Sequence, residues 1–514
     1  KGNWTNSGTY TATLATATVT FSRTAQSITG ASTFKGITIN SGSTVTLAAN
    51  ITINTSLSIT GTLDPTESYL VSGTGTLTVN SGGTLKVKAA NFSSNYTLSG
   101  TVTLNGAGTV NYSSAIIDQN VSSAYNYGYL RISGGTTKYL TANLPPLIST
   151  SSSTGRIYID AGTFDLQTFT ANRNTPSAGG YVIMAGTAKL KIGGTNSFPS
   201  NYNTITIPLT CTVEYYGNNQ TVVAATYGNL TLSSSSGVAT KTMPGSALTI
   251  SGNLTCSAGA GTGVTFTAGN KITINKTVTI DAGSTFNASS YSHAFKGSWV
   301  NNGTFTGSTS TATFSGISSS LSGTGTNNFY NLTFSASGIT GSGSTSVNVA
   351  GNLGTSGSGV FTHNSGGTLT MTGASKTITG SRLKLNNLTV SGTVTLNNAL
   401  TIAGDLTVNG SFTASSNTVT LNGASKTISG SGTIAFTALS ILGTISTSNS
   451  ISTSSNITVS LTGSYTASGG TTTIAASGTL SGTANFYNLT INNSKTLTLG
   501  TSSVLGIAGT FVKT

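Results

Sequence analysis

The sequence predicts an all-β fold, an elongated parallel β-helix (β-solenoid) built from repeats of about 50 residues. Three observations support this prediction: a motif that recurs along the chain, a period-two alternation of threonine with apolar residues, and a scarcity of helix signals. A fixed repeat period of roughly 20 to 50 residues is typical of solenoids, propellers and arrays.

The recurring motif is an aromatic residue or leucine, a short spacer, and then Asn-Leu-Thr followed by an apolar residue, with some degenerate copies. Its central residues are Ile37, Leu130, Leu230, Leu332, Leu388, Leu439 and Leu489. They lie 93, 100, 102, 56, 51 and 50 residues apart, which is one unit of about 50 residues, or two where a copy has decayed. With two coils per unit, we expect these seven side chains to form one row, a core ladder.

Strands are predicted wherever threonine alternates with apolar residues, because this pattern buries one face and exposes the other. Examples are Thr18-Val-Thr-Phe21, Thr368-Leu-Thr-Met371 and Thr418-Val-Thr-Leu421. Gly-, Asn- and Ser-rich turns separate the strands, and stacked Asn and Thr at equivalent corners should hydrogen-bond from coil to coil. A sandwich array or a propeller would also give such short strands, but the units vary in length without a recurring linker.

The domain prediction is a single continuous β-solenoid over residues 1–514, with an irregular, proline-richer section of longer loops over residues 140–225. Five of the seven prolines fall there: Pro145, Pro146, Pro176, Pro199 and Pro208. The chain starts at Lys1, so either a signal peptide has been removed or this is part of a longer protein. Both ends look uncapped, which predicts head-to-tail contact with another copy or with further repeats.

Charged residues make up only 6 % of the chain, and the formal net charge of +13 is spread thinly. The densest basic run is Arg131, Lys138, Arg156, Arg173, Lys189 and Lys191. This distribution argues against nucleic-acid binding and favours a weak attraction to anionic polysaccharide or cell surfaces. No run of 18 apolar residues exists, so the sequence predicts no membrane span.

The two cysteines, Cys211 and Cys256, lie 45 residues apart, which is near one repeat. They either form a disulfide between neighbouring rungs or remain two buried free thiols, and the sequence leaves both alternatives open.

No catalytic, metal or cofactor site is predicted. Glycoside hydrolysis needs a pair of nearby carboxylates, but Asp64 with Glu67 reads as a turn, and Asp160 with Asp165 should lie on different corners. The two histidines, His293 and His363, have no ligand-spaced neighbours, and we expect both at the surface.

Two further alternatives concern the surface. Asn-X-Ser/Thr sequons are frequent, for example at Asn50, Asn91, Asn253 and Asn331, but a chain so rich in these residues contains many by chance. The threonine faces raise an ice-binding alternative, which requires threonine rows that align in one plane.

The block Gly2-Asn-Trp-Thr-Asn6 and the block Phe486-Tyr-Asn-Leu-Thr-Ile491 resemble those of repetitive, secreted β-solenoid surface proteins and adhesins of prokaryotes. The resemblance covers essentially the whole chain and implies an extracellular or cell-surface location. We therefore expect a non-enzymatic structural or adhesive protein, a filament subunit or a stalk segment of an adhesin. The alternative is a carbohydrate-binding or carbohydrate-cleaving β-helix, which a groove lined with aromatic residues and carboxylates would favour.

Overall fold

The computed structural model describes residues 2–104, 106–147, 155–174, 176, 179–343 and 345–514. In these ranges the chain is nearly all β and forms a parallel β-solenoid, as the sequence predicts. One turn takes about 20 residues, not the roughly 25 that two coils per repeat would need. Contacts divide the chain into a first unit, Lys1–Thr242 with Gly259–Gly261, and a second unit, Met243–Ala258 with Thr262–Thr514.

The first unit begins with two parallel sheets, here called sheets A and B. Sheet A contains β1 (Trp4–Thr5), β4 (Gln26–Thr29), β6 (Thr44–Leu47), β8 (Thr62–Asp64), β11 (Thr84–Val87), β14 (Thr109–Tyr112), β16 (Tyr129–Ile132), β18 (Arg156–Ile159), β20 (Tyr181–Met184) and β22 (Thr204–Thr206). Sheet B contains β2 (Tyr10–Thr11), β3 (Thr18–Phe21), β5 (Ser32–Ile39), β7 (Ile51–Ile59), β9 (Val71–Gly73), β10 (Thr76–Val79), β12 (Tyr96–Leu98) and β13 (Val102–Thr103).

From β14 onward, the first unit alternates between sheet A and a third sheet, sheet C. The strands of sheet C in this unit are β15 (Gln119–Val121), β17 (Thr137–Leu140), β19 (Thr163–Asp165), β21 (Lys189–Ile192), β23 (Thr212–Tyr215) and β26 (Asn229–Ser234). One short helix, α1 (Phe92–Asn95), interrupts the strands, and the side chain of Asn91 caps it by accepting from the Ser94 amide. The section 140–225 contains β18 to β24 (Gln220–Thr221), and part of it lies outside the described residues.

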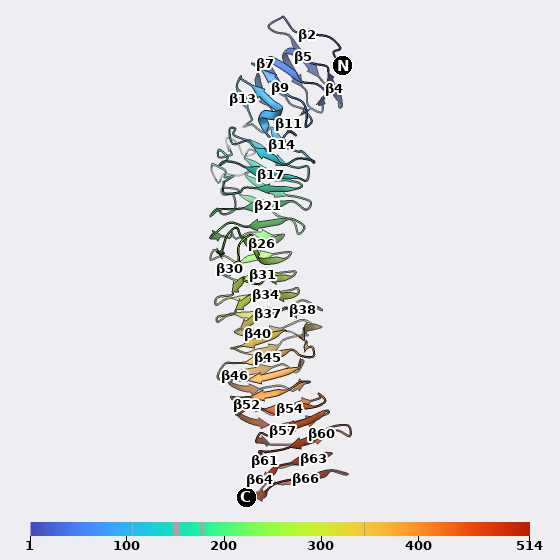
Figure 1. Cartoon of the computed structure of the whole chain (residues 1–514), viewed down its shortest axis with the longest axis vertical. Coiled ribbons are helices and arrows are strands. Elements are labelled where there is room, and N and C mark those ends of the chain that lie inside the picture. The colour runs from blue at the N-terminus through green and yellow to red at the C-terminus, as the bar shows by residue number, and fades with distance from the viewer. Residues whose placement is uncertain (1, 105, 148–154, 175, 177–178, 344) are drawn as a thin grey trace. The chain divides into compact units, whose positions relative to one another are not determined.

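The second unit has three strands in every turn, one on each of three sides. Side 1 takes every third strand from β29 (Leu254–Gly259) to β65 (Leu497–Leu499), side 2 from β30 (Gly263–Thr267) to β66 (Val504–Ile507), and side 3 from β28 (Leu248–Ile250) to β67 (Phe511–Lys513). Figure 1 shows successive strands of side 3 stacked on one another: β34 (Ser292–Phe295), β37 (Thr311–Phe314) and β40 (Asn331–Phe334).

The alternating segments form strands as predicted. Thr18–Phe21, Thr368–Met371 and Thr418–Leu421 are strands β3, β45 and β53, and in the last two the apolar side chains are buried while the threonines remain partly exposed. Because each strand pairs in parallel with the equivalent strand one turn away, apolar side chains stack on apolar side chains along the interior.

The seven residues of the proposed core ladder are all buried, but they do not form one row. Ile37 lies in sheet B, Leu130 in sheet A and Leu230 in sheet C. In the second unit, Leu332 and Leu489 lie on side 3, Leu388 on side 2 and Leu439 on side 1. Their strands, β40, β48 (Asn387–Val390), β56 (Ala438–Ile441) and β64 (Asn488–Ile491), are eight strands apart. Eight is not a multiple of the three strands in a turn, so each copy of the motif moves to another side.

The corners of the second unit confirm the expected contacts from coil to coil. The asparagine before the central leucine of the motif accepts a backbone N–H from the next turn through its side-chain oxygen. Asn387 Oδ1 accepts from the Asp405 amide at 3.0 Å, and Asn488 Oδ1 accepts from the Thr510 amide at 2.8 Å. The asparagine of Asn-Leu-Thr is therefore a structural corner residue, because it satisfies an amide that the sheet leaves unpaired.

Glycines stack where the backbones of adjacent turns come close. A Cβ atom placed on Gly410 would lie 2.0 Å from the carbonyl oxygen of Gly392, and one on Gly432 would lie 2.0 Å from that of Gly410. Real Cβ atoms do not approach so closely, so the corner between sides 2 and 3 admits only glycine there.

Candidate functional site

The acidic residues were the first candidates for chemistry, and most of them are held by cations. Five of the eight acids form ion pairs, all within the first unit: Asp64 with Lys86, Glu67 with Lys88, Asp160 with Arg131, Asp165 with Lys191, and Glu214 with Lys189. Burial alone would raise the pKa of Glu214, but hydrogen bonds from Lys189 and Ser233 and the charge of Lys189 outweigh it and lower the pKa.

The structure does not bring Asp160 and Asp165 together in one sheet. Asp160 follows β18 of sheet A and accepts from Arg131, whereas Asp165 ends β19 of sheet C. Asp165 accepts from the Gln167 amide at 2.8 Å and the Tyr216 hydroxyl at 2.9 Å. The Asp64 carboxylate accepts from the Thr66 amide at 3.0 Å, as expected of a turn. Each carboxylate is thus positioned by a local partner.

The expectation that both histidines lie at the surface is wrong. His293 and His363 are 1 % and 4 % exposed, because strand alternation turns them inward together with Phe295 and Phe361, two residues away. Burial lowers the pKa of both imidazoles. His293 Nδ1 accepts from the Ile272 amide at 3.1 Å, which indicates a neutral ring whose Nε2 donates to the Ala288 carbonyl at 2.8 Å. Both rings are core residues.

The cysteines are two buried free thiols, the second of the alternatives left open by the sequence. Burial raises the pKa of Cys256 to about 12 and raises that of Cys211, so neither is an activated thiolate. Within the described ranges, no group of three or more His, Cys, Asp or Glu residues is arranged to hold a metal ion.

Two lysines of the first unit are buried, which the sequence did not reveal. Lys138 of the basic run donates to the Ser114 carbonyl at 2.7 Å and to Thr136 Oγ1 at 2.5 Å. Lys241 donates to the Gly217 and Asn218 carbonyls at 2.7 and 2.8 Å and to Gln220 Oε1 at 2.5 Å.

Burial lowers the pKa of Lys241 to about 7 and that of Lys138 to about 8. Both lysines lie in register with a glutamine on an adjacent strand, Gln119 beside Lys138 and Gln220 beside Lys241. We call these two sites the Gln–Lys corners. In the sequence, the only sign of them is a glutamine followed by a lysine 19 or 21 residues later.

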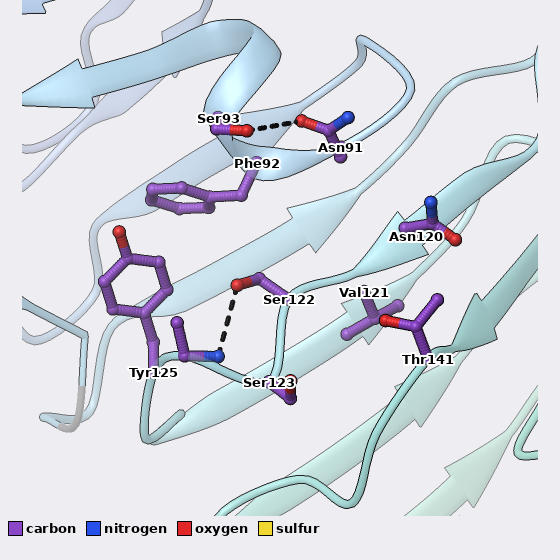
Figure 2. Close-up of a pocket in the computed structure, with 10 residues that line it drawn as sticks. Asn91, Phe92, Ser93, Asn120, Val121, Ser122, Ser123, Tyr125 and Thr141 are labelled. Atoms are coloured by element: carbon purple, nitrogen blue, oxygen red, sulfur yellow. Dashed lines mark hydrogen bonds between the residues drawn. The ribbon is translucent and has the colours of Figure 1, made fainter.

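A depression of about 450 Å³ lies beside α1 in the first unit (Figure 2). It is lined by Asn91, Phe92, Ser93, Asn120, Val121, Ser122, Ser123, Ala124, Tyr125 and Thr141. The rings of Phe92 and Tyr125 form one wall, 4.6 Å apart between centroids. Its lining contains no carboxylate, imidazole or amine, and its titratable side chain is the phenol of Tyr125, whose pKa is raised by burial. Sequence reasoning missed it because three separate segments form it.

The threonine rows bear on the ice-binding alternative. On side 2, Thr265, Thr285, Thr304 and Thr326 are in register over four successive turns. Further along the same side the row continues through Ser346 and Thr368 to Asn387 and Asp405. A continuous threonine plane therefore ends within the unit, and nothing else in this side favours ice as a ligand.

No protein-family model, curated protein or solved structure matches the chain at a significant level. Among the described residues, no helix is long and apolar enough to span a membrane. The class of protein that the fold defines is thus the parallel β-solenoid, and its function has to be argued from its surfaces.

Proposed function

We propose that the chain is a non-enzymatic structural and adhesive segment of an extracellular or cell-surface protein, either a filament subunit or a part of a stalk. The observation that carries this proposal is the uniform stacking of the second unit, where every turn repeats three sides and glycine or asparagine recurs at the corners of several turns. Such an arrangement extends by adding turns, because each turn contacts only its neighbours. An outer surface of threonine, serine and asparagine, with little charge, suits a segment that has to remain hydrated without depending on pH or salt.

The last turn of the second unit supports a stacking partner. Strands β65, β66 and β67 carry exposed apolar side chains: Leu499, Val504, Ile507, Phe511 and Val512. Phe511 is 54 % exposed, although it is in register with Leu489, which is fully buried one turn earlier. Exposed apolar side chains on unpaired strands are favourable sites for adding further strands. We propose that this turn packs against another β-solenoid turn, in a second copy or in further repeats of the same chain.

Sedimentation velocity over a range of concentrations tests the self-association. We expect the wild-type chain to form larger species as concentration rises, and the double variant I507K/F511K to remain monomeric, because Ile507 and Phe511 are in register with the buried Phe486 and Leu489 and lysines there oppose apolar stacking. Leu461→Lys is the matched control, since Leu461 is a fully exposed apolar corner residue away from the last turn. A wild-type chain that is monomeric at all concentrations would exclude the filament form and leave only the stalk form.

A carbohydrate-cleaving function has no comparable support. Its expected sign was a groove lined with aromatic residues and carboxylates, and the depression beside α1 has the aromatic wall without a carboxylate. The carboxylates of Asp160 and Asp165 serve local ion pairs and hydrogen bonds on two different sheets.

A further inference from the structure

The outward face of sheet A changes its chemistry at three neighbouring strands. One outward row runs through Thr44, Thr62, Thr84, Thr109, Tyr129, Arg156, Tyr181 and Thr204, which are register partners on successive strands. Threonine at four positions in a row thus gives way to Tyr-Arg-Tyr on β16, β18 and β20, and threonine then returns. An outward position does not need a large aromatic side chain for packing, so this change calls for another explanation.

The three side chains form a stack with the guanidinium in the middle. The Arg156 Cζ lies 4.9 Å from the ring centroid of Tyr129 and 4.5 Å from that of Tyr181. Arg156 Nη1 also donates to the Tyr158 hydroxyl at 3.2 Å, and its Nε donates to the Gly179 carbonyl at 3.4 Å. Among the described residues none accepts a hydrogen bond from Nη2, which leaves this nitrogen available to an anion. Rings on both sides fix the plane of the guanidinium, so little side-chain entropy remains to be lost when it binds an anion.

Arg156 is a cation without a carboxylate. All eight acids of the chain lie in its described part, and the five ion pairs found there involve other cations. A second arginine adjoins the stack: Arg131 is the register partner of Tyr158, pairs with Asp160, and leaves 49 % of its side chain exposed. We call Tyr129, Arg131, Arg156, Tyr158 and Tyr181 the Tyr-Arg patch.

We infer that the Tyr-Arg patch binds an anionic polysaccharide, with Arg156 holding a carboxylate or sulfate group and the tyrosines packing against sugar rings. Arginine's planar fork matches such oxyanions in two parallel hydrogen bonds. Tyrosine offers a flat apolar face together with a hydroxyl, which suits a sugar ring that has both C–H and O–H groups. The inference rests on the proposed function only in placing the chain where such polysaccharides occur.

The surroundings of the patch favour a glycan over the other polymers that tyrosine and arginine bind. A nucleic acid needs several phosphate contacts, but this face offers one unpaired arginine and one that shares its charge with Asp160. A protein interface needs an apolar centre, but the neighbouring outward positions are Thr109, Asn111, Thr204 and Thr206, with Ile183 as the single aliphatic residue. Hydroxyl and amide groups instead match the hydroxyls of a sugar chain.

Equilibrium binding of the purified chain to three probes tests this inference: polygalacturonate, heparin and uncharged dextran. We expect both anionic probes to bind and dextran not to bind. Arg156→Gln should weaken binding about tenfold or more, because a hydrogen-bonded charge contact is lost. Tyr181→Leu keeps the charge and should weaken binding several-fold through the lost ring. Arg156→Lys should fail to restore full affinity, since a lysine lacks the planar fork.

Arg23→Gln is the matched control, because it removes the same charge from an exposed residue of the first unit outside the patch. Its affinity should remain within about twofold of the wild type, since one distant surface charge contributes little at physiological salt. Circular dichroism and thermal unfolding establish that each variant is folded. Wild-type chain that binds neither anionic probe, equal losses in Arg156→Gln and Arg23→Gln, or tighter binding of single-stranded DNA would each overturn the inference.

The same samples separate this inference from the proposed function. If polygalacturonate binds and is also shortened, as measured by released reducing ends, the non-enzymatic role fails while the binding inference stands. If the chain self-associates in sedimentation but binds no glycan, the structural role stands and the inference fails.

Discussion

Both units stack turns in parallel, but they treat charge in opposite ways. In the first unit, five ion pairs, the buried Lys138 and the buried Arg173 occupy sheets A and C and their loops. The second buried lysine, Lys241, lies on β27 (Val238–Thr242), which pairs with β24. In the second unit the described residues form no ion pair, and the core of its early turns is aromatic: Phe286, Phe295, Trp299, Phe305, Phe314 and Phe329.

The difference follows from the number of strands in a turn. A three-strand turn pairs nearly all of its backbone with adjacent turns and leaves only short corners. Glycine allows the close backbone approach there, and asparagine accepts a backbone amide that the sheet leaves unpaired. From β14 to β23, a turn of the first unit has only two named strands, so longer loops carry carbonyls that strands do not pair. Buried side chains donate to loop carbonyls of this kind: Gln220 to Asn196, Lys138 to Ser114 and Lys241 to Gly217. Buried polar side chains therefore appear where the backbone hydrogen bonds between adjacent turns are incomplete.

The largest effect should come from a charge placed in the second unit's core. Leu388→Asp should lower the free energy of unfolding by about 3–5 kcal/mol, because the carboxylate would be buried between Leu369 and Leu406, its register partners on the adjacent turns. Urea denaturation monitored by circular dichroism measures the loss. Thr389→Asp, on the outward side of the same strand, is the control and should change stability little. Equal losses in the two variants would refute the assignment of inward and outward faces.

A methyl group at a glycine corner should have the next largest effect. Gly410→Ala should cost about 2 kcal/mol or more, since its Cβ would overlap the backbone of the adjacent turn. Gly245→Ala serves as control because a Cβ there meets no atom within 4 Å. Thermal unfolding of both variants measures the difference. A Gly410→Ala chain as stable as Gly245→Ala would show that the stacked corners tolerate side chains.

Buried lysine should make the stability of the first unit depend on pH above neutrality. Lys241 has a pKa of about 7 in the folded chain and about 10.4 when unfolded, so between these values the unfolded chain binds more protons. Stability should therefore rise with pH from about 7 to 10, with a contribution of about 1–2 kcal/mol. Unfolding of the wild type and of Lys241→Met at several pH values isolates this slope.

Lys35→Met, at an outward position of β5, should leave the pH slope unchanged. If Lys241→Met has the wild-type slope, then Lys241 remains charged in its ring of oxygen acceptors at neutral pH, and the lowered pKa is wrong.

The smallest effect is expected from the carboxylates. The double variant D160N/D165N should change no hydrolytic activity and should alter stability by no more than about 1 kcal/mol, since partly exposed ion pairs contribute little. Reducing-end assays on several polysaccharides provide the measurement. Cleavage by the wild type that this double variant abolishes would overturn the proposed function.

Particular residues show how far sequence reasoning reached. The alternation of Thr418-Val-Thr-Leu421 was sufficient to predict a strand and its buried face, because side-chain direction in a strand has a fixed period of two. The same rule, applied to Ser292-His-Ala-Phe295, would have placed His293 inside. The depression beside α1, the Gln–Lys corners and the Tyr-Arg patch could not be predicted, since each joins residues from separate turns whose register was unknown.

The sequence by itself determined the all-β class, the stacking of turns and the burial of the seven motif residues, because these depend on local alternation and on turn-forming residues. Only the tertiary structure decided how many strands complete a turn. In the second unit, three strands in each turn make the motif of the 50-residue repeat move from one side to another. In the first unit, the pairing of β16, β18 and β20 on successive turns stacks Tyr129, Arg156 and Tyr181. Closure of a turn depends on long-range backbone pairing, which no local pattern of side chains specifies.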